Sequence, residues 1–365
     1  MVDAELVQRA KTLLDELCQN PRFTGTAEEA AARELCKREL QNAGFDCRQR
    51  PFEYSEWPGR WGPPLSAAVQ VATIIIVARM AMERGPLSAL LIGGALIAAL
   101  FFVDAYAKRR WVTNSSRLRA RSVNLEAKRG APRVWLVAHL DSKSQTVPML
   151  LRIAGSISLI AVMALALAML LLSLVGVEVG LWPAVTVAAI VAALPGLVCL
   201  VRNDSPGAVD NASGVIAVML ASQSATAPRD LGVLITSGEE LGLAGARVWA
   251  LSARTDSQIL NCDTVDDRGE WRCMYTSSKP QPIVRAAASV AKRLGAQLRV
   301  SRLIPGILAD NMAFADRGIP AVTLSRGTLS TLARIHTRRD NSNALTGKGA
   351  AEASVLLSAL AKELA

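Results

Sequence analysis

Four long apolar stretches interrupt a chain whose other segments mix polar and apolar positions. They cover roughly residues 65–82, 86–103, 153–177 and 179–201 and form two close pairs. A helix of about 20 apolar residues crosses a bilayer core of about 30 Å. The pattern predicts membrane helices, most clearly for the second pair. The first pair contains Arg79 and is shorter, so an interfacial or re-entrant hairpin and buried core helices remain open for it.

Each close pair predicts a helical hairpin that returns to the side of the membrane it left. The soluble segments therefore share one face. The stretch YAKRRWVTNSSRLRARSVNLEAKR is rich in Lys and Arg, whereas the loop of the second hairpin carries only Glu178. The positive-inside rule then places the soluble part of this integral membrane protein in the cytoplasm. The predicted parts are one soluble domain from 1–64, 104–148 and 202–365, a first membrane hairpin at 65–103 and a second at 149–201.

The soluble segments alternate between helical and strand-like patterns. Helical spacing predicts helices at 3–19, 27–43, 212–224, 241–252, 281–294 and 346–364. Short apolar runs rich in β-branched residues predict buried strands at RVWLVAHL, LGVLITS, SQILNCD and AVTLS. This alternation favours an α/β fold with a largely parallel central sheet.

Composition and charge narrow the function further. Apolar residues make up 51% of the chain and aromatic residues only 4%, which suits packed or lipid-facing helices. The net charge of +10 comes without zinc-finger spacing or an RNA-binding signature, so we expect a membrane surface as partner and no nucleic acid. The six cysteines are scattered, and we expect reduced thiols. The first residues lack the basic-then-apolar order of a signal peptide.

The two histidines are candidate metal ligands. His139 lies in VAHLDS at the end of a predicted strand, and His336 lies in ARIHTRRDN. Residues two apart on a strand point the same way, so the Asp141 carboxylate can accept a hydrogen bond from the imidazole nitrogen of His139 that is not bound to metal. A lone histidine is more often structural, and an HxD pair alone is weak support.

Four acidic residues follow predicted strands or turns. Asp210 lies in GAVDNASG, Glu239 and Glu240 in ITSGEELGLAGA, and Asp263 in QILNCD. A helix N-cap is the alternative for Asp210, and a solvated pair at a helix N-terminus is the alternative for the two glutamates. Adjacent carboxylates point in different directions, so one can bind a metal while the other holds a proton.

Together these residues predict a shared cation site. We expect five ligands at five strand ends, gathered at the carboxyl edge of the sheet. Two histidines with three acids, one of them bridging, suit two Zn²⁺ ions about 3.5 to 4 Å apart. Mn²⁺ or Co²⁺ would also fit.

The order and spacing of HLDS, GAVDNASG, SGEELGLAGA, NCD and IHTRRDN resemble the M28 metallopeptidases. The resemblance extends to FTGTAEEAAARELCKRELQNAGFDC, PFEY and DRGIPAVTLS, and so covers nearly all of the soluble sequence. It implies the zinc-dependent exopeptidase fold, with a mostly parallel mixed sheet flanked by helices. It also implies that the soluble domain is a peptidase catalytic domain acting on peptide substrates.

Residue by residue, the resemblance implies a two-zinc aminopeptidase site. One zinc would be bound by His139 and Asp263, and the other by Glu240 and His336. Asp210 would bridge the two ions. The resemblance further implies that Glu239 is the general base and that Asp141 orients His139.

The chain departs from the family pattern in ways that leave alternatives open. The two hairpins interrupt the peptidase sequence, so we expect the site close to the membrane. Ala309, Asp310 and Asn311 stand where many relatives have Ser-Asp-His, which leaves the role of that loop open. The alternatives are a carboxypeptidase or amidase on the same scaffold, a one-zinc glutaminyl cyclase, a catalytically inactive membrane scaffold, and a transporter. The oligomeric state is not indicated by the sequence.

Overall fold

The computed structural model describes residues 2–365 with gaps at residues 178, 277 and 305. The chain divides into two compact units, each of which is described by itself. The first comprises Met1–Ser55, Leu118–Ser144 and Arg202–Ala365, and the second comprises Glu56–Arg117 and Gln145–Val201. Glu178, in the predicted loop of the second hairpin, lies outside the described residues, as do the side chains of residues 101–111.

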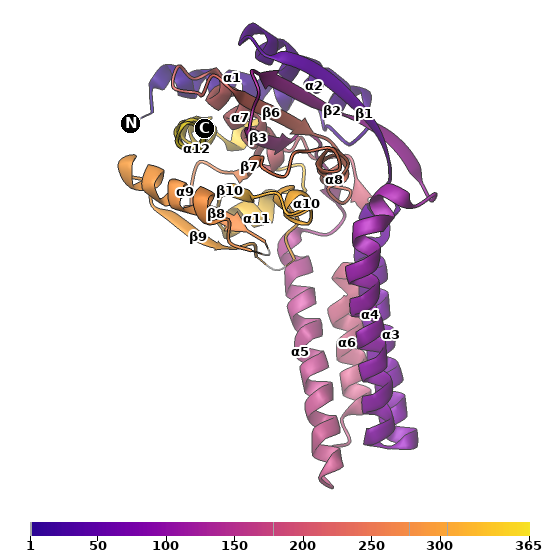
Figure 1. Ribbon diagram of the computed structural model, residues 1–365. Coiled ribbons are helices and arrows are strands. Elements are labelled where there is room, and N and C mark those ends of the chain that lie inside the picture. Colours follow the sequence, from indigo (N-terminus) through magenta and orange to yellow (C-terminus); the bar gives the residue numbers. More distant parts are fainter. Residues whose placement is uncertain (1, 178, 277, 305) are drawn as a thin grey trace. The chain divides into compact units, whose positions relative to one another are not determined.

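The first unit is built on an eight-stranded mixed sheet of order β1-β2-β6-β3-β7-β10-β8-β9 (Figure 1). The strands, in sheet order, are β1 Asp46–Ser55, β2 Arg119–Arg129, β6 Leu231–Thr236, β3 Val134–His139, β7 Gln258–Val265, β10 Ala321–Gly327, β8 Glu270–Tyr275 and β9 Leu298–Arg302. Its centre, β6-β3-β7-β10, is parallel, as are β8 and β9. The remaining neighbours are antiparallel. The predicted fold class is therefore confirmed.

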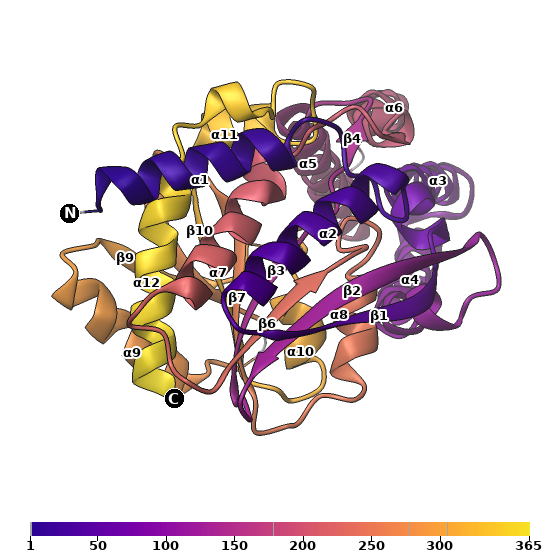
Figure 2. The same cartoon turned by 90° about the horizontal axis from the view of Figure 1, so that it is seen from above.

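Helices cover both faces of this sheet (Figure 2). One face carries α7 (Ser213–Gln223), α9 (Gln281–Arg293) and α12 (Lys348–Leu364), with α1 (Ala4–Leu17) and α2 (Ala27–Asn42) on the same side. The other face carries α8 (Ala244–Ala250) and α10 (Asn311–Ala315). All six residues of β3 and all six of β6 are buried. This burial explains why the central strands read as unbroken apolar runs.

An aromatic cluster fixes α8 and α10 against the sheet. The ring centroids of Trp135 and Trp249 are 4.8 Å apart, and those of Trp249 and Phe314 are 5.7 Å apart, both in edge-on geometry. A Cβ at Gly232 would lie 2.3 Å from the Trp135 ring, so glycine leaves room for it. These contacts hold the strands whose carboxyl ends carry the candidate site.

The predicted elements of the soluble segments match observed ones to within a few residues. Four strands toward the two edges of the sheet were not predicted from the sequence, namely β1, β2, β8 and β9. β1 alternates exposed charges with buried Phe52 and Tyr54, and it lacks a continuous apolar run. Further short elements are α11 (Leu329–Arg334) and the paired strands β4 (Ser144–Gln145) and β5 (Val201–Arg202).

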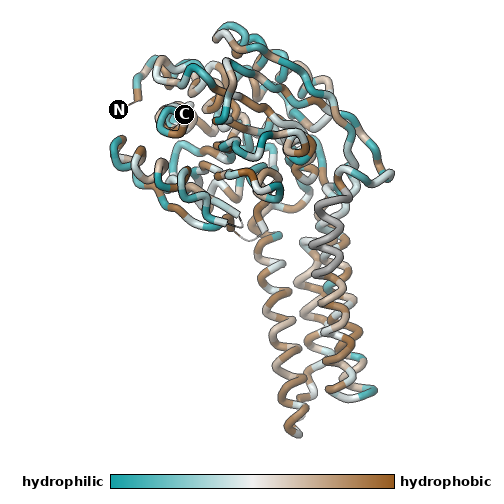
Figure 3. The backbone as a smooth tube through the Cα atoms, viewed as in Figure 1, coloured by the Kyte–Doolittle hydropathy of each residue, from teal (hydrophilic) through white to brown (hydrophobic). Residues whose placement is uncertain are grey.

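The second unit consists of apolar helices, drawn mostly in brown in Figure 3. They are α3 (Trp57–Arg84), α4 (Pro86–Asn114), α5 (Met149–Leu174) and α6 (Trp182–Leu197). Among the described residues, α3 with 28 residues and α5 with 26 residues are long and apolar enough to cross a membrane. Arg79 lies within α3 and does not interrupt it.

The last apolar stretch forms a shorter helix than predicted. α6 has 16 residues, and it begins with Trp182 and Pro183 rather than at residue 179. Proline lacks a backbone N–H and fits the first turn of a helix, which explains this start. At 1.5 Å per residue α6 is about 24 Å long, below the bilayer core of about 30 Å.

Candidate metal centre

The five predicted ligands come from five different segments around one edge of the sheet. His139 is the last residue of β3, and Asp263 lies within β7, two residues before its end. Glu240 follows β6, and Asp210 lies in the turn Ala208–Ala212 that leads into α7. His336 follows helix α11 rather than a strand. The expectation of five strand ends is wrong for Asp210 and His336. Asp210 reaches the site from a turn before α7, and His336 reaches it from the segment after α11.

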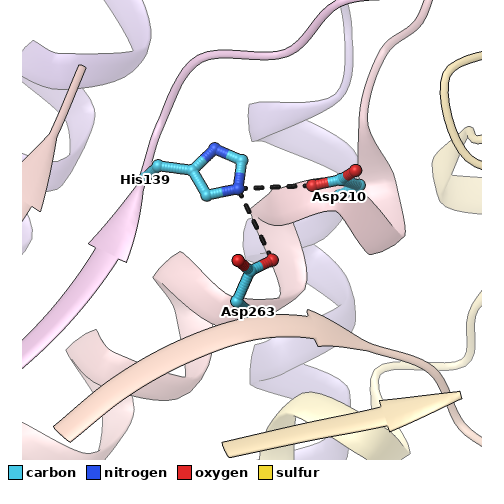
Figure 4. A group of neighbouring side chains, drawn as sticks. All are labelled: His139, Asp210 and Asp263. Carbon is cyan, nitrogen blue, oxygen red and sulfur yellow. Dashed lines mark ion pairs between the residues drawn. The ribbon is translucent and has the colours of Figure 1, made fainter. Parts of the chain in front are cut away.

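Asp210 lies between the two histidines and presents one oxygen to each. Its Oδ1 is 3.3 Å from His139 Nε2, and its Oδ2 is 3.1 Å from His336 Nε2. Figure 4 shows the imidazole of His139 facing both Asp210 and Asp263, whose Oδ1 is 3.6 Å from Nε2. On the other side, His336 Nε2 lies 3.3 Å from Glu240 Oε1.

These contacts form two buried groups that share Asp210. The first consists of His139, Asp210 and Asp263, and the second of Asp210, Glu240 and His336. In each group the candidate ligand atoms all lie within 4.8 Å of one another. Histidine nitrogens with carboxylate oxygens are the donor set that zinc prefers. The groups are therefore compatible with metal binding.

Two buried atoms at the centre favour a cation over a closed network of hydrogen bonds. His139 Nε2 and Glu240 Oε1 are inaccessible to solvent and have no hydrogen-bond partner within the described part of the chain. Unpaired buried polar atoms are costly unless they bind something. A metal ion between the two groups would satisfy both atoms.

The pKa values follow from burial and from the excess of acids. Burial alone would lower the pKa of His139, but the carboxylates of Glu239, Asp210 and Asp263 raise it well above its usual value. Burial would raise the pKa of Asp210, but the neighbouring imidazoles of His139 and His336 lower it strongly. The acids thus favour protonated, positively charged imidazoles. A bound metal cation would supply this positive charge in place of the protons.

Asp141 acts on the site differently from what the sequence suggested. The nearest polar atom to His139 Nδ1 is the main-chain oxygen of Asp141, at 3.0 Å, whereas the carboxylate lies 3.7 Å away. The carboxylate accepts hydrogen bonds from the backbone N–H groups of Glu239 and Glu240, at 3.2 and 3.1 Å, and from the Thr24 hydroxyl. It therefore fixes the turn that carries the two glutamates, and the carbonyl fixes the His139 ring.

Glu239 and Glu240 point to different partners, as expected for adjacent acids on a turn. Glu239 Oε2 lies 4.0 Å from His139 Nε2. Burial, together with the charges of Glu240 and Asp263, raises the pKa of Glu239 well above its usual value. Burial opposes ionisation of Glu240 as well, but Lys143 and His336 lower its pKa. Glu239 thus has a strong affinity for a proton, and Glu240 remains an anion.

Backbone contacts fix the turn around Asp210. The Asp340 carboxylate accepts hydrogen bonds from the backbone N–H groups of Val209 and Asp210, at 2.8 and 3.1 Å. Asn211, joined to Asp210 by a cis peptide bond, donates to the Cys262 carbonyl at 2.9 Å. These contacts anchor the turn to β7 and to the segment after His336.

Glycine is required where this turn enters α7. A Cβ at Gly214 would lie 2.5 Å from the Cys262 carbonyl oxygen and 2.2 Å from Asn211 Oδ1. The first turn of α7 can therefore approach β7 only with glycine at this position. His336 is the converse case, because a non-glycine residue there adopts a φ of +60°. Such a conformation costs on the order of 1 to 3 kcal/mol and is typical of functional sites.

Two residues near the ligands had no role assigned from the sequence, the partly buried Lys143 and the buried Asp310. Lys143 lies 2.7 Å from Glu240 Oε2, and its position directly after HLDS was the only available signal. Asp310 receives a hydrogen bond from the Thr236 hydroxyl at 2.5 Å, and burial raises its pKa to about 7. Asp310, in the loop whose role the sequence left open, thus lies beside the end of β6.

Comparison with known proteins identifies the family of the chain. The profile of Peptidase family M28 matches residues 122–361. The chain belongs to peptidase family M28. A comparison with curated protein sequences found no match.

Solved structures of similar fold include aminopeptidases and glutaminyl cyclases. An aminopeptidase from Aneurinibacillus sp. strain AM-1 aligns over 97% of this chain and 92% of its own, with 14% identity and a TM-score of 0.57. A zinc aminopeptidase from Bacillus subtilis aligns over 97% and 94%, with 14% identity and a TM-score of 0.55. A glutaminyl cyclase from Fimbriiglobus ruber aligns over 98% and 95%, with 14% identity and a TM-score of 0.56. At this identity the likeness establishes the fold of the M28 peptidase and leaves the exact activity to be inferred from the site.

Proposed function

We propose that this protein is a membrane-anchored dinuclear zinc aminopeptidase that releases N-terminal residues from peptides. The observation that carries the proposal is the position of Asp210, which presents Oδ1 to His139 at 3.3 Å and Oδ2 to His336 at 3.1 Å. A carboxylate in this position can bridge two cations. The family supports a peptide substrate, and the zinc aminopeptidase of similar fold supports the choice of metal.

The proposed ligands divide between two zinc ions. His139 and Asp263 would bind one ion, Glu240 and His336 the other, and Asp210 both, in agreement with the two buried groups. Mn²⁺ or Co²⁺ would fit the same donors. Zinc bound here would polarise the scissile carbonyl and make a bound water more acidic.

Glu239 is the proposed general base. It is buried, it lies next to the site, and its raised pKa suits a group that takes up a proton and later releases it. The water oxygen forms a bond to the carbonyl carbon while Glu239 accepts the water proton. Glu239 then passes the proton to the leaving amine nitrogen as the peptide C–N bond breaks. The Asp141 carboxylate keeps Glu239 in place by accepting a hydrogen bond from the Glu239 backbone N–H.

The proposal is tested by comparing wild type with Glu239→Gln in full-length protein purified in detergent. Peptides with free or acetylated N-termini are incubated with zinc-loaded enzyme, and released amino acids are identified. We expect stepwise release from free N-termini, no release after acetylation, and a loss of about 10²- to 10⁴-fold in Glu239→Gln with zinc retained. Glu270→Gln, at a half-exposed position, is the matched control.

Other outcomes of this assay would point to other activities. Near-normal turnover by Glu239→Gln would refute the mechanism. Release from the C-terminus would indicate a carboxypeptidase. Ring closure of N-terminal glutamine would indicate a cyclase, for which Asp210, Glu240 and His336 alone would supply one zinc site. Against the cyclase, the first group, with His139 and Asp263, could hold a second ion.

We further propose that the apolar helices anchor the protein in a lipid bilayer as two hairpins, near 65–103 and 149–201, and that 1–64, 104–148 and 202–365 form the catalytic domain. α5 exposes large apolar side chains on several sides, including Ile157 at 62% and Ile160 at 65%. A helix that is apolar all round suits lipid. The protein should remain in the membrane pellet at alkaline pH, whereas release into the supernatant would contradict the anchor.

The proposed cytoplasmic location can be tested with Cys47. This cysteine is partly exposed in the segment before the first hairpin. A membrane-impermeant thiol reagent should label it only after cell lysis. Labelling in intact cells would place the catalytic domain on the outer side.

A further inference from the structure

The two carboxylate oxygens of Glu240 have different partners. Oε1 is buried, has no hydrogen-bond partner in the described part of the chain, and lies 3.3 Å from His336 Nε2. Oε2 lies 2.7 Å from the ammonium nitrogen of Lys143. Oε1 therefore faces the candidate metal site, and Oε2 is held by the Lys143 ammonium.

Lys143 is well placed to maintain this difference. Its Nζ also donates a hydrogen bond to the main-chain oxygen of Glu240, at 3.1 Å, so the ammonium is held from two sides of the same residue. The side chain of Lys143 is 14% exposed and that of Glu240 is 4% exposed. A charge-assisted pair at this distance, largely shielded from water, is strong enough to fix a carboxylate rotamer.

We propose that Lys143 is a positioning residue that restricts Glu240 to one-oxygen binding of a metal ion and so weakens the hold of the site on that ion. This inference rests on the proposed function and names a residue outside its ligand set. An ammonium on Oε2 prevents Glu240 from binding with both oxygens. Its positive charge also repels a nearby cation, because the interior screens charges less than water does.

The consequence for catalysis concerns the charge left for the substrate. A carboxylate whose outer oxygen is neutralised by Lys143 donates less to a bound cation. More of the charge of that cation is then available to the scissile carbonyl. Lys143 would thus lower the metal affinity of the site and raise its turnover, while it touches neither the substrate nor the metal.

The test compares wild type, Lys143→Met and Lys143→Arg as full-length protein in detergent. Methionine keeps the length and apolar stem of lysine and removes the charge, whereas arginine keeps the charge. Lys37→Met is the matched control, because Lys37 pairs with Glu34 at 3.3 Å on helix α2, at a more exposed position. Zinc affinity is measured by competition with a chelator, and kcat and KM are measured on one unblocked peptide.

We expect Lys143→Met to bind one zinc equivalent at least about tenfold more tightly than wild type. Its kcat should fall about tenfold with little change in KM, which is the scale of effect found for groups that support metal ligands. When Lys143→Met is loaded with Co²⁺ in place of zinc, the visible absorption of the bound Co²⁺ should be weaker than in wild type, because a higher coordination number weakens it. Lys143→Arg should keep the wild-type metal affinity, and Lys37→Met should match wild type in every measurement.

The direction of the affinity change decides the inference. Weaker or unchanged zinc binding in Lys143→Met, with normal binding by wild type, would overturn it, because a lysine that merely supports the fold would loosen the site when removed. Zinc lost from both Lys143 variants would overturn it in the same way. Wild type that binds no zinc would instead overturn the proposed function, and the inference with it.

Discussion

A buried glutamate outside the proposed ligand set should make stability depend on pH. Glu29 in α2 is fully buried and accepts hydrogen bonds from the Gly25 backbone N–H at 2.8 Å and from the hydroxyls of Ser122 and Ser237. Burial, and next the charge of Asp141, raises its pKa from 4.5 to about 7. The folded protein therefore keeps a proton that the unfolded chain would release.

The sign and size of the effect follow from this shift. A raised pKa contributes stability that is fully present below pH 4.5 and is lost as the pH rises through about 7. A shift of this size corresponds to about 3 kcal/mol. In Glu29→Gln the side chain stays neutral, so the contribution no longer varies with pH. Relative to wild type, the variant should gain about 2 to 3 kcal/mol of stability between pH 5 and pH 8.

The assay is thermal unfolding at pH 5 and pH 8 with zinc held saturating. The quantity to compare is the thermal unfolding midpoint of Glu29→Gln minus that of wild type. This difference should be larger at pH 8 than at pH 5 by on the order of 5 to 10 °C. Glu34→Gln on the same helix, where the glutamate is 46% exposed, is the control and should follow wild type. An equal difference between Glu29→Gln and wild type at both pH values would refute the reasoning.

Three further predictions concern packing, metal and thiols. Gly214→Ala should destabilise the protein by about 1 to 3 kcal/mol, because the added Cβ would meet the Cys262 carbonyl. An unchanged unfolding midpoint would contradict this. Gly94→Ala, where the added Cβ has open space around it, is the control. Removing metal with a chelator should lower the unfolding midpoint, and zinc at 100 times its Kd should restore about 2.7 kcal/mol; no response to zinc would argue against a bound metal. Of the six cysteines, all of them described, only Cys47 is partly exposed, so one thiol should react in the native protein and six after denaturation, and rapid reaction of several native thiols would contradict the packing.

The centre of the fold was predictable because its signals are local. β3 and β6 are buried on both faces, so their sequences are continuous apolar runs that cannot be mistaken for loops. The edge strands were missed for the opposite reason. β1 has one exposed face and carries charges on it, so its pattern resembles that of a polar segment.

The ligand set was predictable only as residue types, and its geometry was not. His336 and Asp210 reach the site from turns next to α11 and α7, and no strand pattern precedes them directly. The turn of the Asp141 side chain toward the backbone of Glu240 depends on how the β3 and β6 ends meet. Lys143 was missed because its role comes from a carboxylate about 100 residues away in the sequence.

The limits of the apolar helices were the least predictable feature. The sequence between 179 and 201 is apolar throughout, but α6 occupies only Trp182–Leu197. Helix length depends on where backbone hydrogen bonding begins and ends, and Pro183 sets the beginning here. Hydropathy records only which residues are apolar.

The most direct test of the central claim is the zinc stoichiometry of wild type and His139→Ala. His139 belongs to one of the two buried groups only, whereas Asp210 belongs to both. Purified protein dialysed against trace-metal-free buffer would be analysed by mass spectrometry of its metal content. We expect two zinc ions per wild-type chain and one in His139→Ala. A single zinc ion in both proteins would contradict the dinuclear site.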